Sequence, residues 1–375
     1  MINQYFSGQR IFGRRAFACA CVATVVLCTA VPAVFSDVLV GGIINRDTRW
    51  TADQGPYIVT QDILVTGRAH LSIGPGTAIL VGKPTYREKA IPQIDAIDSA
   101  TIAITIEGGL DCVGRADKRI SFVPQTGNRQ GPQWYGIVFR KAPDNYAELA
   151  YTDISGAYNA ISVFDSRPAV HHCRIDFNNA GIVCGGHGDA RVFNCVIVYN
   201  FTTGIRISLA NPTFENNIIA FNKNNGMWCD GASKITFEYN CVFGNADGNL
   251  MDCDPELGVM KKKSERKDST DYKDNIFKNP IFAGSEYDSV AVERDVSLPT
   301  DKSRIRDTAL ARVLEPTLKD SLAARKRSGQ YMHYSLSRYS PCIHAGSPSS
   351  EFKNGDGSRD DIGLYGGSRY APQRK

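Results

Sequence analysis

The chain of 375 residues has a formal net charge of +4, with 34 glycines and 11 cysteines. Three arginines and no acidic residue precede Asp37, so the rest of the chain is close to neutral, which argues against a nucleic-acid partner. A glycine-rich chain of this length with many short apolar runs favours a single elongated solenoid.

Residues 1–36 have the features of an export signal. A cluster of arginines precedes an uncharged run from Ala16 to Phe35, and small residues before Asp37 offer a cleavage point. The alternative is an uncleaved anchor, because the run approaches the ~20 residues that span a bilayer. We expect an exported protein, in the periplasm, at the cell surface or outside the cell. Membrane contact is expected only through this segment, if it stays attached.

The β-structure is predicted to cover residues 37–285. Gln61–Gly82 and Ile104–Gly127 each contain two runs of alternating apolar residues around a turn, and Trp134–Phe139 begins another coil. The charged, proline-containing segment Lys83–Ala100 is predicted to be a loop that leaves the coil.

Residues 168–255 repeat one pattern four times, with a period of about 22 residues. Each unit has an alternating apolar run, a corner, a glycine and a second alternating run. Two such strands cannot bury a face alone, so the units are expected to stack in parallel ladders about 4.8 Å apart. The predicted corner column is Asn178, Asn200, Asn222 and Asn245, and the glycine column is Gly181, Gly204, Gly226 and Gly248.

A corner asparagine followed by a glycine and an apolar residue, repeated at this period, resembles the coil of the pectin-lyase-like superfamily. The resemblance implies an all-β fold, a right-handed parallel β-helix solenoid of the bacterial secreted type. The right-handedness comes from the resemblance alone.

The chain changes character after Pro255. Residues 286–330 are predicted to form a charged, partly helical insertion, because apolar residues within Asp301–Arg327 recur at helical spacing. The turn-rich residues 331–375 resemble the closing segment of secreted β-helix proteins and are expected to cap the solenoid. No cofactor is expected except possible Ca²⁺, for which the candidate ligands are Asp356, Asp360 and Asp361.

Eight cysteines remain outside the export segment, and an even number in an exported protein is compatible with disulfides. Their spacing follows the coil, so buried ladder thiols are the favoured interpretation, with Cys173 and Cys195 as the one pair close enough to bridge. His171 and His172 are adjacent in a strand, and alternation should point only one of them outward. No metal is expected there, because no third ligand is evident.

The stacked alignment also brings candidate functional residues together. Arg206 and Trp228 fall in one outward column, and the turn that follows this column contains Asp165, His187, Asp189 and Asp230. An arginine, an aromatic ring, an imidazole and several carboxylates on one face suit an acidic sugar.

Two functions remain open. The first is a cell-surface or periplasmic protein, expected to be a monomer, that binds a glycan or has a structural role through the Arg206/Trp228 face. The second is a polysaccharide lyase or glycoside hydrolase acting on a uronate-containing polysaccharide, with His187 or Arg206 as catalytic residues and Asp165, Asp189, Trp228 and Asp230 binding substrate. Gly186-His187-Gly188 and Arg206-Ile207 resemble motifs of polygalacturonases, although the paired aspartates of those hydrolases are absent.

Overall fold

The computed structural model describes residues 37–83, 101–127, 131–144, 146–260, 270–283, 334–354 and 357–367. The predicted export signal, almost all of the predicted loop 83–100, the predicted insertion 286–330 and Asp356 lie outside these ranges.

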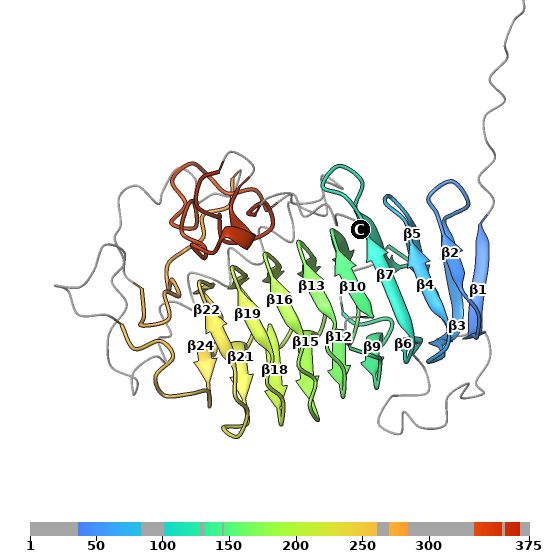
Figure 1. The fold of residues 1–375 in the computed structure, drawn as a ribbon, viewed down its shortest axis with the longest axis horizontal. Helices are drawn as coiled ribbons and strands as arrows, with labels where there is room; N and C mark the ends of the chain where they lie inside the picture. The colour runs from blue at the N-terminus through green and yellow to red at the C-terminus, as the bar shows by residue number, and fades with distance from the viewer. Residues whose placement is uncertain are drawn as a thin grey trace, which may run out of the picture. The chain divides into compact units, whose positions relative to one another are not determined.

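The described chain winds into a parallel β-helix (Figure 1). Most turns contain three strands. One row of parallel strands contains β5 (Ala78–Val81), β8 (Ile120–Pro124), β11 (Thr152–Ile154), β14 (Arg174–Asp176), β17 (Val196–Val198), β20 (Ile218–Ala220) and β23 (Cys241–Phe243). A second row contains β6 (Ala103–Ile106), β9 (Gly136–Arg140), β12 (Asn159–Phe164), β15 (Ala180–Gly185), β18 (Ile205–Ser208), β21 (Asn225–Cys229) and β24 (Gly248–Met251).

The long strand β3 (Tyr57–Val65) pairs with both β5 and β6, and it joins the two rows into one 16-stranded sheet that also includes β1 (Val38–Ile44). The third row is a separate eight-stranded sheet. It contains β2 (Thr48–Trp50), β4 (His70–Ile73), β7 (Gly109–Val113), β10 (Ala147–Ala150), β13 (Ala169–His171), β16 (Arg191–Phe193), β19 (Thr213–Glu215) and β22 (Thr236–Glu238).

The expectation of two strands per unit was wrong, because most turns contain three. A single residue with positive φ divides the first apolar run of each unit, and the residues at this bend are Tyr151, His172, Asn194, Asn216 and Tyr239. A left-handed backbone angle turns an extended chain sharply, so one run in the sequence becomes two strands on different faces.

The interior is filled by columns of apolar side chains. Ile175, Ile197 and Ile219 lie in register in the first row, and each is fully buried. Val192, Phe214 and Phe237 form the matching column of the eight-stranded sheet. Because alternate residues of a strand point to opposite faces, each strand contributes one apolar side to this core.

The predicted asparagine column is confirmed as a hydrogen-bonded ladder. The side-chain oxygen of Asn200 accepts from the backbone N–H of Asn178 at 3.1 Å, and that of Asn222 accepts from Asn200 at 3.0 Å. Asn245 continues the ladder, and the spacing between rungs is 22 or 23 residues. The ladder supplies partners to corner backbone groups that no strand can satisfy.

The last coil contains one residue more than the exact repeat predicted. Met227 lies opposite Leu250 and Asn225 lies opposite Gly248, so Gly248 is displaced by one position from the predicted glycine column. The predicted columns are otherwise in register, with Ile182 opposite Ile205 and Ile205 opposite Met227.

The expectation for the cysteines was wrong in one respect. A disulfide joins Cys229 to Cys253, whereas Cys173 and Cys195 are free and buried, as expected of ladder thiols. With the one-residue displacement of the last coil, Met251 lies opposite Trp228 and not opposite Cys229.

The C-terminal residues pack on the outer face of the first row. Ile362 and Leu364 lie in one apolar cluster with Val196 and Ile218. Asp360 is fully buried and accepts from the side-chain amides of Asn194, at 3.1 Å, and Asn216, at 2.6 Å. In the described part of the chain, the 3₁₀ helix η2 (Ser350–Phe352) is the only helical element, and no helix could cross a membrane.

Candidate functional site

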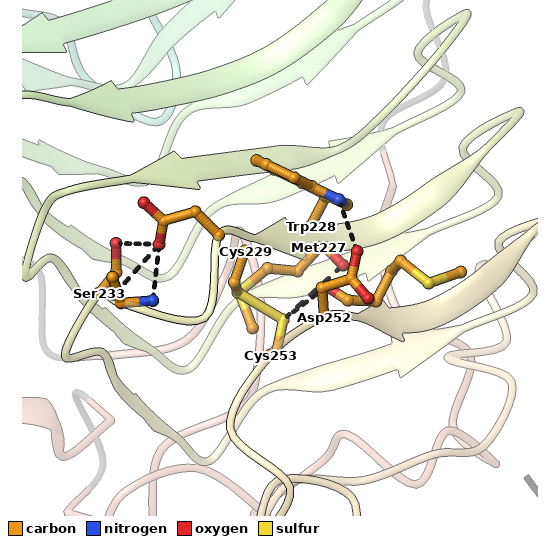
Figure 2. The surroundings of a disulfide bond; sticks show 9 residues. Met227, Trp228, Cys229, Ser233, Asp252 and Cys253 are labelled. Atoms are coloured by element: carbon orange, nitrogen blue, oxygen red, sulfur yellow. Dashed lines mark hydrogen bonds between the residues drawn. A yellow bond between two sulfur atoms is a disulfide. The ribbon is translucent and has the colours of Figure 1, made fainter.

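The predicted neighbours Arg206 and Trp228 lie opposite each other on β18 and β21. The Arg206 guanidinium carbon is 5.2 Å from the centre of the Trp228 ring, a cation–π contact. The indole N–H of Trp228 donates to Asp252 at 3.0 Å (Figure 2). The indole is therefore held by one neighbouring turn while its ring faces the other.

The predicted turn residues share one edge of the helix. Asp165 bonds through its backbone to Gly186, and His187 bonds through its backbone to Leu209. Asp165 and His187 both have positive φ, because they form the tight bends that follow β12 and β15. Both residues are therefore structural parts of the turns, held there by backbone hydrogen bonds.

Asp230 holds two turns together. Its carboxylate accepts from the backbone N–H of Leu209 at 2.7 Å, from the hydroxyl of Ser208 at 3.0 Å, and from the backbone N–H and hydroxyl of Ser233. Desolvation opposes ionisation, but these hydrogen bonds outweigh it and lower the pKa of Asp230 to about 2. The Asp230 carboxylate already accepts hydrogen bonds from protein donors, so a sugar hydroxyl would have to compete with them.

Asp189 has a similar role, since it accepts from the backbone N–H of Asn211 at 2.8 Å. Among the residues that the structure describes, no group of three or more His, Cys, Asp or Glu side chains is arranged to hold a metal ion. Of the Ca²⁺ candidates, Asp360 is engaged by asparagines and Asp361 accepts from the backbone of His344.

A pocket of about 370 Å³ lies on the outer side of the eight-stranded sheet. Asp111 on β7 lies opposite Glu148 on β10, Glu148 lies opposite Ala169 on β13, and Ala169 lies opposite Arg191 on β16. The small side chain of Ala169 leaves a depression between the carboxylate of Glu148 and the guanidinium of Arg191. This pocket is a second candidate site.

One wall of the pocket contains His70 beside Asp111. The Nε2 atom of His70 is 3.0 Å from a carboxylate oxygen of Asp111, without a hydrogen bond between the two atoms. Gly109 makes room for the imidazole, because a Cβ there would lie 2.1 Å from His70 Nδ1. The Tyr146 ring meets the imidazole edge-on, and Tyr146 is 46% exposed.

The floor of the pocket contains the second histidine–carboxylate pair. His171 Nε2 lies 2.8 Å from Glu148 Oε1 in hydrogen-bonding geometry. Phe193 stacks on the imidazole with the ring centres 4.7 Å apart, and the guanidinium of Arg191 lies over Phe193. Only 2% of the His171 side chain is exposed, against 26% for Glu148, so Glu148 is the member of the pair that meets the solvent.

Two arginines supply positive charge at the rim. Arg167 is 3.2 Å from Asp144 and 3.6 Å from Asp189, and Arg191 is 2.9 Å from Glu351. Both arginines remain largely exposed, so these surface ion pairs are weak and can be exchanged for another carboxylate.

The sequence alone did not identify this pocket. Period-two alternation does place His70, Asp111 and Glu148 on the outward side of their strands. However, His70 lies 39 positions before its register partner Gly109, because the predicted loop 83–100 intervenes. No fixed repeat could therefore reveal that the three residues meet.

Residues 126–253 match a family model described as a right-handed beta helix region. Two solved structures are similar to the chain at 13% identity. One is the periplasmic alginate epimerase AlgG, with 57% of this chain and 58% of that chain covered and a TM-score of 0.28. The other is pectate lyase Pel9A, with 80% and 88% covered and a TM-score of 0.30. The chain spans 58% of the epimerase structure.

No curated protein matches the sequence. The family model covers the same turns in which the asparagine ladder and the three-strand coils are found. The corner repeat resembles the coil of the pectin-lyase-like superfamily, which has this fold. Together these observations identify the chain as a right-handed parallel β-helix protein.

Proposed function

We propose that this protein binds an acidic polysaccharide, and that the binding site is the pocket formed by His70, Asp111, Glu148, His171, Arg167 and Arg191. The observation that carries the proposal is the juxtaposition of two histidine–carboxylate pairs with two exposed arginines around one depression. Arginine pairs with carboxylates in a planar, bidentate way, and carboxylates accept hydrogen bonds from sugar hydroxyls.

The chemistry of the rim supports an anionic ligand. Arg191 and Arg167 are each neutralised by a protein carboxylate, and a uronate could replace Glu351 or Asp144 at little cost. The exposed ring of Tyr146 offers an apolar face beside these polar groups, which suits the mixed surface of a sugar.

A polysaccharide lyase or hydrolase is the second candidate. The observation that favours it is the hydrogen-bonded pair of His171 and Glu148, because an acid–base pair beside an arginine is what abstraction of a proton next to a uronate carboxylate requires. Binding without cleavage and binding with cleavage use the same pocket, so the measurement of a cleavage product, rather than the choice of variant, separates them.

Both candidates include export. The arginines and apolar run of residues 1–36 support a periplasmic, cell-surface or extracellular location, where polysaccharides are accessible.

The test is binding and turnover with polygalacturonate, alginate and a neutral dextran, for the wild type, Arg191→Ala and the control Arg206→Ala. Absorbance at about 235 nm reports the unsaturated product of a lyase, and released reducing ends report hydrolysis. We expect binding to the anionic polymers alone, weakened about tenfold or more in Arg191→Ala and unchanged in Arg206→Ala. Equal binding of dextran, or loss of binding only in Arg206→Ala, would overturn the assignment to this pocket.

A further inference from the structure

The adjacent histidines His171 and His172 are both buried. His171 lies on the outer side of β13 at the floor of the pocket, where Phe193 stacks on it. His172, with a φ of 51°, forms the bend between β13 and β14. The two imidazoles therefore turn toward each other, and their Nδ1 atoms lie 3.0 Å apart.

A hydrogen bond on the side of His172 that faces away from His171 determines which of its ring nitrogens carries a proton. Its Nε2 atom lies 2.9 Å from the backbone oxygen of Gly366. A carbonyl oxygen can only accept, so Nε2 of His172 carries a proton. Burial, followed by repulsion from His171, lowers the pKa of His172 to about 3, so the ring is neutral at pH 7 and its Nδ1 atom is an acceptor.

The protonation of His172 then determines whether Nδ1 of His171 carries a proton. Two ring nitrogens at hydrogen-bonding distance need one donor, and His172 Nδ1 cannot donate, so Nδ1 of His171 carries the proton. The other nitrogen of His171, Nε2, faces Glu148 Oε1 at 2.8 Å. A bare nitrogen and a carboxylate would repel at this distance, so one further proton lies between Nε2 and Oε1.

We infer that His172 and the Gly366 carbonyl are positioning groups that hold the Nδ1 proton of His171 in the hydrogen bond between the two histidines. The proton shared by His171 Nε2 and Glu148 is then the one that the pocket can exchange with a ligand. The use of this proton on a sugar rests on the proposed function. The pair is neutral while it retains this proton. Transfer of the proton to a ligand oxygen leaves one negative charge on Glu148, which the cations at the rim offset, and the His171–His172 bond stays intact in both cases.

The surrounding charges are compatible with this arrangement. In the pocket, Asp111, Arg167 and Arg191 accompany Glu148, and the two arginines also pair with Asp144, Asp189 and Glu351 at the rim. Behind the pair, Arg119 donates to the backbone oxygen of His172 at 2.8 Å and pairs with Asp153. The ring of Tyr151 stacks on His172 with the centres 4.7 Å apart and fixes its plane.

Gly366 reaches His172 from 194 positions away in the sequence. The burial of Asp360 between Asn194 and Asn216 holds the C-terminal residues at this place. Docking of residues 357–367 on the first row is therefore linked to proton placement in a pocket on the eight-stranded sheet.

The test is ¹⁵N NMR of the imidazole nitrogens in the full chain at pH 7. In the wild type we expect His172 protonated at Nε2 only, and His171 protonated at Nδ1. In Glu148→Gln we expect His171 to keep the Nδ1 proton and to lose the Nε2 proton, because the glutamine amide can donate in its place. His171 with a bare Nδ1 in the wild type would overturn the inference.

A second variant isolates His172. Tyr151 and Tyr239 occupy the equivalent bend with similar positive φ, so the backbone tolerates an aromatic residue in His172→Phe. We expect this variant to lose the Nδ1-protonated signature of His171, whereas the exposed control His344→Phe keeps it. Retention of the signature in His172→Phe would contradict the inference. The spectra require no ligand, so absence of glycan binding would reject the proposed function and leave the proton assignment standing.

Discussion

Cys229, the last residue of β21, is disulfide-bonded to Cys253, which follows β24 one turn further along the helix (Figure 2). The bond joins two residues that are 24 positions apart in the sequence, and it links the turn that contains β21 to the turn that contains β24. We expect Cys253→Ser to lower the free energy of unfolding by about 2–4 kcal/mol, because the unfolded chain gains freedom. Urea unfolding checks this. A reductant should destabilise the wild type and leave the variant unchanged, and equal sensitivity of both proteins would contradict the expectation.

The asparagine ladder should be a main source of stability. Asn200 accepts from the backbone and side chain of Asn178 and donates to Ile175 and Asn222, all in the buried interior. Asn200→Ala leaves at least one buried backbone N–H without a partner, so we expect a loss of about 2–4 kcal/mol. The exposed Asn211→Ala is the control and should cost less than about 1 kcal/mol. Similar losses in the two variants, measured by thermal unfolding, would argue against the ladder.

Asp360 makes the docking of the C-terminal residues dependent on pH. Burial raises the pKa of Asp360 to about 7, against hydrogen bonds from Asn194 that lower it. The folded chain thus binds a proton that the unfolded chain, with a pKa near 3.8, has released, and the contribution of Asp360 to stability falls as pH rises from about 4 through 7. We expect the stability of the wild type relative to Asp360→Asn to fall by roughly 2–4 kcal/mol over this range, since asparagine does not titrate.

The control for that measurement is Asp247→Asn, at an exposed position. Denaturant unfolding of the three proteins at several pH values gives the comparison. A difference between wild type and Asp360→Asn that is constant with pH, or that grows as pH rises, would show that Asp360 is ionised in the folded chain throughout.

Ala169 provides a way to fill the pocket without removing any polar group. It lies on the outer side of β13 between Glu148 and Arg191, partly exposed. Ala169→Leu should abolish glycan binding by occupying the depression, and should change stability by less than about 1 kcal/mol, because the added atoms point outward. Calorimetric binding measurements, with Ala232→Leu on the turn edge as control, test this. Unchanged affinity in Ala169→Leu would place the ligand elsewhere.

The two candidate faces also differ in their response to salt. A ligand carboxylate in the pocket replaces exposed ion pairs of Arg167 and Arg191, so affinity should fall when salt is raised from about 0.05 to 0.5 M. Arg206→Ala should reduce neither the affinity nor this dependence, because it removes only a cation–π contact with Trp228, worth about 0.5–1 kcal/mol. Loss of the salt dependence in Arg206→Ala would favour the Arg206/Trp228 face.

The repetitive part of the fold was predictable because each coil repeats the same local chemistry. The corner asparagines, the inward isoleucines and the Arg206/Trp228 neighbours all follow from a period of about 22 residues. Prediction was less accurate where the period changes. One added residue in the last coil displaced Gly248, and the pairing of Cys229 with Cys253 was missed.

The sequence by itself determined the β-helix and its asparagine ladder, since both depend on contacts between residues at a fixed spacing. Only the tertiary structure decided which side chains meet across irregular connections. His70 joins Asp111, and Gly366 reaches His172, through intervals that no period predicts. The physical reason is that hydrogen-bond geometry and burial select partners by distance in space, and a single residue with positive φ, such as His172, is enough to redirect a side chain to another face.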